Sequence, residues 1–228
     1  LLESRGLGDV YKRQIMNRAG IHSIWREHDG GDKAVAHRIK EMTLVAKDSD
    51  PLCNNDVCYD TAMLENFEQD TQDLKQDSII FYHISGSHGP TYFERYPDEH
   101  KKFTPDCARA DIENCTKEEV VNTYDNTILY TDFFLSQAIQ KLEKLTDKYN
   151  VALMYISDHG ESLGENGVYL HGMPYSLAPK EQTHVPMILW MSDGFAAQKG
   201  ISETCLRKAG KEQSFSHDNL FDSLLGLM

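Results

Sequence analysis

The chain has 228 residues and a mass of 26.0 kDa, and its 36 acidic and 23 basic side chains give a formal charge of −13 at pH 7. This acidic balance argues against nonspecific nucleic-acid binding, because neutralising phosphates requires an excess of basic side chains. The longest apolar run, Val185 to Met191, is far shorter than the roughly 20 residues of a membrane-spanning helix. The length suits one medium-sized domain.

Strand and helix signals alternate along the chain without repeats. In chain order they are a strand at 22–25, a loop at 26–32, a helix over 60–74, a strand at 78–84, a helix from 116 to about 149, strands at 151–156 and 185–191, and a helix at 218–225. Thr116 and Glu119 form a capping box at the start of the long helix. Ser216 is the candidate N-cap of the last helix.

Continuous apolar strands separated by helices indicate an α/β fold with a mostly parallel central sheet flanked by helices. Binding sites in such sheets form beyond the carboxyl ends of the strands. Two segments occupy such positions: Ser85 to Pro90 (SGSHGP) after the strand at 78–84, and Ser157 to Glu161 (SDHGE) after the strand at 151–156. Each places a histidine next to a glycine, so these segments are the first candidates for a functional site.

The cysteines form two close pairs, Cys53 with Cys58 and Cys107 with Cys115, while Cys205 stands alone. Short loops of this kind favour local disulfides, and disulfides indicate an oxidising compartment such as a periplasm. A metal site is the alternative, but the C-x4-C and C-x7-C spacings differ from the C-x2-C of most zinc sites and no histidine adjoins them. We expect the partner of Cys205 to lie outside this chain.

Metal binding is also suggested by the histidines at loop positions. Asp158 and His159 come where a strand opens into a loop, and carboxylate oxygen and imidazole nitrogen are ligands that suit zinc. His171 and His88 also adjoin glycines. Any one of the ten histidines is more often a surface or hydrogen-bonded residue than a ligand. Three of them in this context make metal chemistry as plausible as a purely structural role.

One extended run resembles a known family. Ser157 to Gly167 (SDHGESLGENG), followed by Tyr169 to Pro174 (YLHGMP), is similar to the lipid A phosphoethanolamine transferases, a branch of the alkaline-phosphatase/sulfatase superfamily that includes the mobile colistin-resistance enzymes. Asp-His-Gly alone recurs across that superfamily, but the extended run is specific. Further matches are GSHGPTYF at 86–93, RYP at 95–97, KFTP at 102–105, NTYDN at 122–126, Trp25-Arg26 with Lys33 downstream, and HDNLF at 217–221.

The resemblance implies an enzyme anchored in the bacterial inner membrane with its catalytic domain in the periplasm, acting as a monomer. It implies transfer of phosphoethanolamine from phosphatidylethanolamine to a lipid A phosphate through a covalent threonine intermediate, leaving diacylglycerol. Adding a cationic group to lipopolysaccharide would weaken the attraction of a polycationic drug, so polymyxin resistance is the implied phenotype. The family also has disulfides where the pairs Cys53/Cys58 and Cys107/Cys115 fall.

The resemblance also assigns site residues. In that family a zinc ion is held by a glutamate, the threonine nucleophile, an aspartate and a histidine, and Asp158 and His159 match the last two. Lys33 matches a lysine that contacts phosphate, although it could also be a surface charge in a polar loop. His88 and His171 match histidines that bind phosphoethanolamine. These two either hold a second zinc ion or supply the proton that the departing alkoxide needs, because one imidazole cannot do both at once.

Other residues near these motifs have structural interpretations. We expect Glu161 and Glu165 to cap or support their neighbours rather than bind metal. The aromatic stretch from Tyr92 to Tyr96 is expected to pack the His88 loop. His217 and Asp218 are expected to begin a helix rather than to form part of a site.

The resemblance covers Ile15 to Met228 and implies a sulfatase-like fold that is incomplete on its N-terminal side. Leu1 to Gln14 does not continue the family pattern, so we expect an unrelated leader or a variable linker there, followed by a partial catalytic domain over 15–228. The family's threonine and glutamate precede the Trp25 region. We therefore expect this chain alone to bind zinc weakly and to be inactive, and robust single-turnover transfer by it would contradict that expectation.

Two other classes of function remain open. A sibling enzyme, such as a phosphoglycerol transferase, sulfatase or phosphodiesterase, would apply the same metal chemistry to another ester. A noncatalytic relative would be a periplasmic domain kept for binding. The presence of Asp158, His159, His88, His171 and Lys33 argues against the second class.

Overall fold

The structure, a computed structural model, describes residues 18–28, 41–44, 52–54 and 57–228. The chain divides into two units, one formed by Leu1–Leu135 with Glu161–Thr183 and the other by Ser136–Gly160 with His184–Met228. Each unit is built around its own small sheet. None of the helices in the described ranges combines the length and the apolar character that crossing a bilayer requires.

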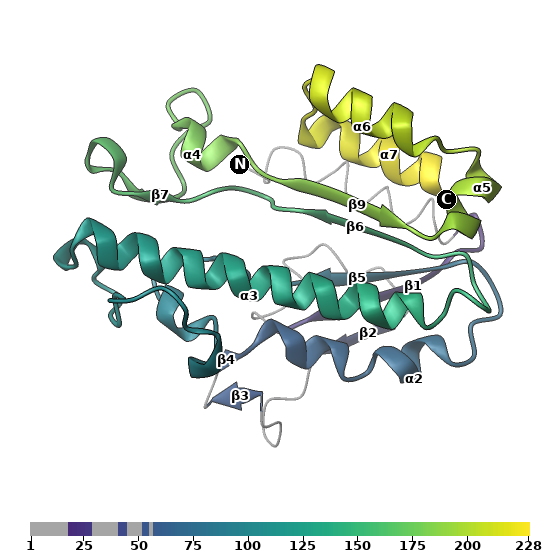
Figure 1. Cartoon of the computed structure of the whole chain (residues 1–228), viewed down its shortest axis with the longest axis horizontal. Helices are drawn as coiled ribbons and strands as arrows, with labels where there is room; N and C mark the ends of the chain where they lie inside the picture. The colour runs from purple at the N-terminus through teal and green to yellow at the C-terminus, as the bar shows by residue number, and fades with distance from the viewer. Residues whose placement is uncertain (1–17, 29–40, 45–51, 55–56) are drawn as a thin grey trace. The chain divides into compact units, whose positions relative to one another are not determined.

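A three-stranded parallel sheet lies in the first unit. Its order is β2 (Glu41–Leu44), β1 (His22–Glu27), β5 (Ser78–His83), so β1 is the central strand (Figure 1). Trp25 of β1 is 8% exposed and lies opposite Phe81 of β5, with 5.8 Å between their ring centroids. The α/β fold class and the parallel pairing of the first two predicted strands are confirmed.

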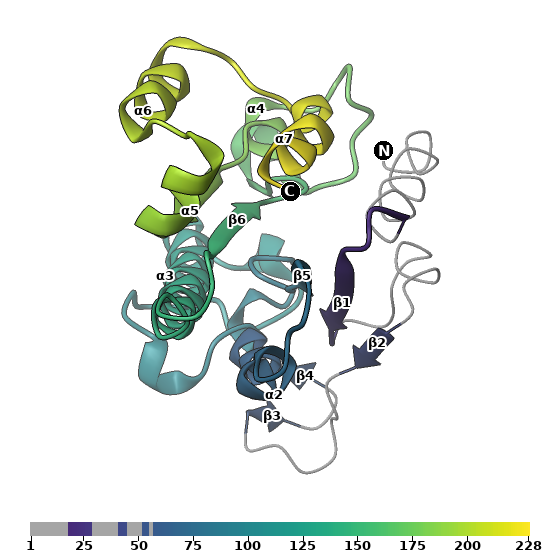
Figure 2. The same cartoon turned by 90° about the vertical axis from the view of Figure 1, so that its right-hand side faces the viewer.

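The first strand continues two residues beyond its predicted end. Arg26 and Glu27 were expected to begin a loop, but both are buried strand residues. A buried guanidinium is tolerated only when its charge is compensated, and here the Arg26 Nε donates to Asp70 Oδ2 at 2.9 Å, with a second contact from the same guanidinium to Oδ1. This ion pair joins β1 to α2 (Phe67–Thr71), which lies against one face of the sheet in Figure 2.

The helix predicted over 60–74 is instead two short segments. Asp60–Leu64 forms the 3₁₀ helix η1 and Phe67–Thr71 forms α2, with Asn66 between them at φ −90° and ψ 4°. Asp60 accepts hydrogen bonds from the chain after β5 rather than serving only its own helix. The buried side chains Ala62 and Met63 of η1 pack with Cys58 in a small hydrophobic cluster. Asp60 therefore contacts a distant part of the chain, and the predicted helix is interrupted after η1.

The long predicted helix is α3 (Lys117–Glu143), which ends before the predicted end at Tyr149 in a series of turns. Its capping box is confirmed. The Thr116 hydroxyl accepts from the Glu119 amide at 3.2 Å, and the Glu119 carboxylate accepts from the Thr116 amide at 2.7 Å. Apolar side chains of this region form a second cluster that consists of Tyr92, Cys107, Ile112 and Val120, with Cys115, Tyr124, Leu163 and Leu170 packed against it.

Short elements complete the first unit. They are the antiparallel pair β3 (Cys53–Asn54) and β4 (Val57–Cys58), the 3₁₀ helices η2 (Tyr92–Glu94), η3 (Asp98–His100) and η4 (Ile112–Asn114), the antiparallel pair β7 (Ser162–Leu163) and β8 (Tyr169–Leu170) with η5 (Glu165–Gly167) between them, and α4 (Lys180–Thr183). Both predicted disulfides are present, Cys53 with Cys58 and Cys107 with Cys115.

The second unit contains an antiparallel pair, β6 (Ala152–Ile156) and β9 (Met187–Met191). Both strands were predicted, but as members of a parallel sheet, so the direction of β9 is a correction. The strand also begins at Met187 rather than Val185. Pro186 has no amide hydrogen for a sheet ladder, although its carbonyl accepts from the Ser157 amide at 3.4 Å.

Three helices and a 3₁₀ turn follow β9: α5 (Asp193–Lys199), α6 (Glu203–Glu212), η6 (His217–Asn219) and α7 (Leu220–Leu227). Figures 1 and 2 both place α6 and α7 on the same side of the β6–β9 pair. The last predicted helix is confirmed as η6 followed by α7; Ser216 is the N-cap of η6 in a capping box, and Asn219 directly precedes α7. Helices α5 and α6 were not predicted from the sequence; they are capped by Ser192 and Ser202. Cys205 lies exposed on α6 without a disulfide.

The Cys107–Cys115 disulfide provides a first testable prediction. Replacing both cysteines with alanine is expected to lower the free energy of unfolding by about 2.5 kcal/mol, because a crosslink of this loop length restricts the unfolded chain by about that much. Urea unfolding of the variant and of the unaltered protein measures the difference. A variant in which Cys53 and Cys58 are replaced is expected to lose slightly less, about 2 kcal/mol, because its loop is shorter. An unchanged unfolding midpoint in both variants would contradict the prediction.

Candidate active site

The segment after β5, Ser85 to Pro90, is held from several sides within the first unit. The amide of Gly89 donates to Glu161 Oε1 at 3.1 Å, and the Arg95 Nε donates to the carbonyl oxygen of His88 at 3.1 Å. The Ser87 hydroxyl lies 2.7 Å from the hydroxyl of Thr127 on α3. Hydrogen bonds thus hold both the backbone of this segment and its Ser87 side chain. The position of His88 is therefore set by neighbouring parts of the chain as well as by the segment itself.

Gly89 lies where the chain approaches other groups closely. A Cβ atom at this position would lie 2.6 Å from Leu170 Cδ2 and 2.7 Å from the Tyr92 hydroxyl. Tyr92 is 1% exposed, which agrees with the expectation that the aromatic stretch packs the His88 loop. Burial, together with the negative charge of Glu161, raises the pKa of Tyr92 well above its ordinary value. The phenol therefore stays neutral beside the carboxylate.

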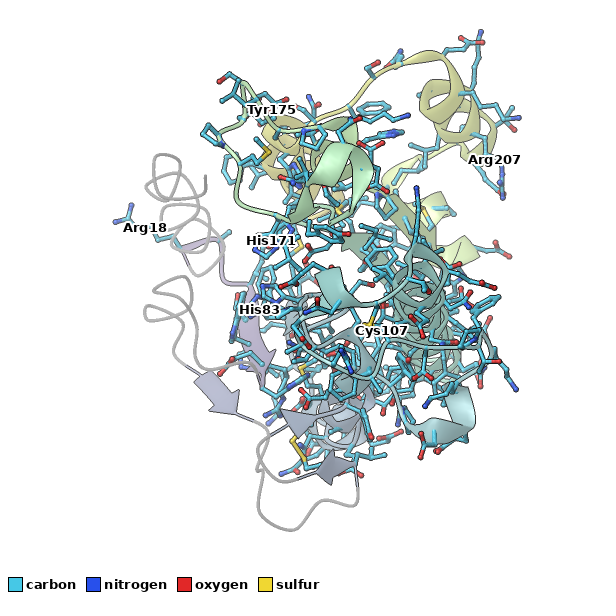
Figure 3. All side chains as sticks on the ribbon, turned by 90° about the vertical axis from the view of Figure 1, so that its left-hand side faces the viewer. Arg18, His83, Cys107, His171, Tyr175 and Arg207 are labelled. Atoms are coloured by element: carbon cyan, nitrogen blue, oxygen red, sulfur yellow. A yellow bond between two sulfur atoms is a disulfide. The ribbon has the colours of Figure 1, made fainter. Side chains whose placement is uncertain are left out.

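His171 is presented by a strained stretch of backbone. Leu170 has φ 61° and Gly172 has φ 99°, and the left-handed conformation is unusual for a leucine. These conformations place His171 at the inner end of a loop whose outer end carries Tyr175, which is 70% exposed (Figure 3). The ring of His171 lies 4.9 Å from the ring of His88, measured between centroids. The two histidines that the sequence analysis selected from separate motifs are thus neighbours.

Glu161 connects the two histidine-bearing segments. Its Oε1 lies 3.0 Å from His171 Nδ1 and also accepts from the Gly89 amide. Because a carboxylate only accepts hydrogen bonds, Nδ1 of His171 carries the proton, and in the neutral ring Nε2 carries the lone pair. The Glu161 side chain is 3% exposed, whereas that of His171 is 30% exposed. This arrangement of an orienting carboxylate behind a histidine is typical of metal ligands and of proton-transfer residues.

Asp158 and His159 follow β6 in the second unit. The His159 amide donates to Asp158 Oδ1 at 3.0 Å, and the Ser157 hydroxyl donates to the His159 carbonyl at 2.6 Å. His159 Nδ1 lies 3.1 Å from the carbonyl oxygen of Gly160, so this nitrogen carries the proton and Nε2 is the lone-pair nitrogen of the neutral ring.

These two residues fit a zinc ion by their chemistry and spacing. His159 Nε2 and Asp158 Oδ2 are 3.7 Å apart. Two ligands of a tetrahedral zinc, each about 2.0–2.1 Å from the ion, lie about 3.3 Å from each other, so a small adjustment brings both atoms onto one ion. The Asp158 side chain is 60% exposed and remains accessible.

His217 has a contact that the sequence analysis missed. It begins η6 as expected, but its Nε2 also donates to the carbonyl oxygen of Ser157 at 2.8 Å, next to Asp158. The HDNLF match to the family at 217–221 was the available signal. Lys33, the predicted phosphate contact, and residues 1–14 lie outside the residues that the structure describes.

Comparison with known proteins identifies the family. Residues 6–228 match the model of the family described as Sulfatase. The chain belongs to the sulfatase family.

Within the sulfatase family, the chain is similar to phosphoethanolamine transferases. It is 46% identical to phosphoethanolamine transferase EptA of Escherichia coli K12 over 93% of this chain and 39% of that protein. The soluble domain of lipooligosaccharide phosphoethanolamine transferase A from Neisseria meningitidis matches with a TM-score of 0.90 and 42% identity, over 95% of this chain and 64% of that one. The integral membrane form of the Neisseria protein matches with a TM-score of 0.88 and 42% identity, over 95% and 40%.

This sulfatase-family chain spans about two fifths of the length of the curated relative from Escherichia coli. The likeness to the Neisseria domain confirms the α/β, sulfatase-like fold class that the sequence predicts, and the described residues form helices and small sheets. The similarity covers both units of the chain, since 95% of its residues are aligned.

Gly89 provides a prediction for this sulfatase-family fold. Gly89→Ala is expected to lower the free energy of unfolding by about 1–3 kcal/mol, because the added methyl group overlaps the buried Tyr92 and displaces the His88 loop. Gly210→Ala on α6 is the matched control, since no atom lies within 4 Å of its Cβ position. The control is expected to leave stability unchanged or raise it slightly. Equal effects of the two substitutions in thermal unfolding would refute the steric explanation.

Proposed function

We propose that the complete protein transfers phosphoethanolamine from phosphatidylethanolamine to a phosphate group of lipid A. The observation that carries this proposal is the pairing of His88 with His171 over the buried Glu161, in a chain similar to named phosphoethanolamine transferases. The donor's phosphorus–oxygen bond to diacylglycerol breaks and the departing oxygen takes a proton. The phosphoethanolamine group first joins a threonine hydroxyl and then a lipid A phosphate oxygen. The threonine is the one that the family resemblance places before the Trp25 region.

A zinc ion is part of the proposal. Asp158 and His159 would hold it, because carboxylate and imidazole are zinc ligands and their spacing suits one ion. Such an ion neutralises charge on a phosphoryl group and lowers the pKa of a coordinated hydroxyl. Lys33 would add a positive point charge for one phosphate oxygen.

His88 and His171 have two alternative roles in this proposal. As a neutral ring, His171 has its lone pair on Nε2 because Glu161 fixes the proton on Nδ1, so it would serve as a ligand for a second zinc ion or accept from the ethanolamine ammonium. As a protonated ring, it would donate from Nε2 to the departing diacylglycerol oxygen. Metal analysis of the purified complete protein tests the second zinc site, because a zinc ion held by His88 and His171 predicts two zinc ions per chain, whereas the proton-donor role predicts one.

The proposed location is the periplasmic side of the bacterial inner membrane. Two disulfides in the first unit suit an oxidising compartment, and the Neisseria relative is described as an integral membrane protein. The proposed partners are the two lipids, with the protein acting as a monomer. Polymyxin resistance would follow from the added cationic group on lipid A.

Expressing the complete gene in a polymyxin-sensitive bacterium and measuring lipid A by mass spectrometry tests the proposal. The expected result is a new lipid A species heavier by one phosphoethanolamine group, with diacylglycerol as the second product. His171→Ala is the matched variant and should lack that species. A phosphoglycerol increment would indicate the sibling transferase, and unchanged lipids with retained binding of phosphatidylethanolamine vesicles would indicate a noncatalytic domain. Both outcomes contradict the proposal.

A further inference from the structure

A buried carboxylate, that of Asp60, gathers three hydrogen-bond donors in the first unit. Its Oδ1 accepts from His28 Nε2 at 2.8 Å and from the Ser85 amide at 2.8 Å, and its Oδ2 accepts from the Gly86 amide at 2.9 Å. Asp60 is 4% exposed and His28 is 6% exposed. Hydrogen bonds to an ionised acceptor in such surroundings are short and strong. Both residues therefore hold the local chain in one arrangement.

The donors come from the carboxyl ends of two neighbouring strands. His28 directly follows Glu27, the last residue of β1, and Glu27 lies opposite His83, the last residue of β5. Ser85 and Gly86 open the loop that carries His88, and His28 opens the segment that leads to Lys33 in the sequence. In parallel sheets this edge is where sites form. Asp60 thus ties together the starts of the two segments after β1 and β5.

Asp60 itself is on a fixed support. It begins η1, whose next residue, Thr61, has its hydroxyl 2.7 Å from the Tyr130 hydroxyl on α3. Gly86 adopts φ 53°, in the left-handed region that favours glycine, at the point where its amide donates to the carboxylate. The buried Arg26–Asp70 ion pair of β1 instead connects the strand to α2. Arg26 and His28 therefore hold different segments to this part of the chain.

We propose that His28 and Asp60 are positioning residues for the His88 loop. Asp60 holds the Ser85 and Gly86 amides, and His28 orients the Asp60 carboxylate and fixes it to the end of β1. Neither residue touches the reacting groups; they act through the placement of His88. This inference rests on the proposed phosphoethanolamine transfer for its consequence in catalysis. Its structural part, the tether on Ser85 and Gly86, is measurable without any activity.

Four variants of the complete protein test the proposal. In Asp60→Asn, an amide nitrogen replaces one carboxylate oxygen, so at least one of the three donors loses its acceptor. His28→Leu removes the orienting donor, while His28→Gln restores an N–H donor in a side chain of similar reach. Thr61→Val is the control, because it removes a hydrogen bond from the same 3₁₀ helix without contacting the loop. Each variant is assayed for transfer kinetics, for thermal unfolding, and for amide hydrogen exchange of the peptide that spans 84–90.

The expected result is a loss of about 10- to 100-fold in kcat/KM for Asp60→Asn and His28→Leu, the usual scale for misplaced catalytic groups. Exchange at Ser85 and Gly86 accelerates in both variants. His28→Gln recovers most of the activity and of the protection, and Thr61→Val lowers the melting temperature with kcat/KM and exchange unchanged. If loss of activity follows loss of stability equally in Thr61→Val and Asp60→Asn, or if His28→Leu leaves exchange unchanged, the proposal fails. If the unaltered protein transfers nothing to lipid A, the hydrogen-exchange rates of these variants still decide whether His28 and Asp60 hold the Ser85 and Gly86 amides.

Discussion

Asp158→Asn in the complete protein is expected to slow phosphoethanolamine transfer by about 100-fold or more and to lower its zinc content. The substitution removes one of the two charged oxygens of a proposed zinc ligand that lies 3.7 Å from His159 Nε2. Metal ions contribute several kcal/mol to stabilising a charged transition state, and about 1.4 kcal/mol corresponds to a factor of ten in rate. The measurements are product formation from labelled phosphatidylethanolamine and elemental analysis of the purified protein.

Asp222→Asn on α7 is the matched control, because it makes the same chemical change at an exposed position of the same unit. The control is expected to keep both its zinc content and its transfer rate. Added zinc should partly restore the rate of Asp158→Asn if the loss is one of affinity, since metal binding follows mass action. A variant that keeps full zinc occupancy and full activity would show that Asp158 is not a ligand.

Glu161→Gln is expected to slow transfer by about 10- to 100-fold with a smaller effect on stability. Glu161 Oε1 accepts from both His171 Nδ1 and the Gly89 amide, and the neutral amide oxygen of glutamine would accept these two hydrogen bonds less strongly, while an N–H group would replace the buried Oε2. Partners that orient a histidine from behind have effects of this size on activity. Steady-state kinetics with varied donor concentration measure the loss.

Glu165→Gln distinguishes this role from a general need for acidic residues in the β7–β8 hairpin. Its Oε2 accepts from the Leu163 amide at 2.6 Å, a local contact within the hairpin. We expect this variant to lose a few tenths of a kcal/mol of stability and no more than about twofold in rate, because the amide oxygen can keep the single hydrogen bond. Equal losses of activity in the two variants would argue against a specific link between Glu161 and His171.

The elements that the sequence predicted well are those in which local signals and packing agree. The apolar run that became β1 carries residues that the sheet buries, the run that became β5 is half-buried beside it, and the capping boxes at Thr116 and Ser216 fix helix starts through contacts only three residues apart. The direction of β9 was wrong because an apolar run indicates a strand but says nothing about the direction of the strand it pairs with. The polar helix α6 has few apolar residues, so its N-cap Ser202 was its main signal.

Among the candidate site residues, the sequence predicted possible ligands and a supporting role for Glu161, but it missed Asp60 and His28. His88, His171, Asp158 and His159 stood out because histidines beside glycines followed predicted strands. Asp60 and His28 gave no such signal, since they are 32 positions apart and each is unremarkable in its own segment. Their significance arises from the parallel pairing of β1 with β5, which brings the two strand ends together. Contacts of this kind depend on register, and register is decided by the whole sheet.

The two disulfides have a consequence for biogenesis in the proposed periplasmic location. Before export, thiols in the cytosol remain reduced, so the newly made chain would lack both crosslinks, which join cysteines five and eight positions apart. It is then in its least stable form, as suits a polypeptide that must stay unfolded to pass a translocation channel. Oxidation on the far side closes both loops after passage. In the proposed location, disulfide formation would therefore stabilise the first unit only after the chain has crossed the membrane.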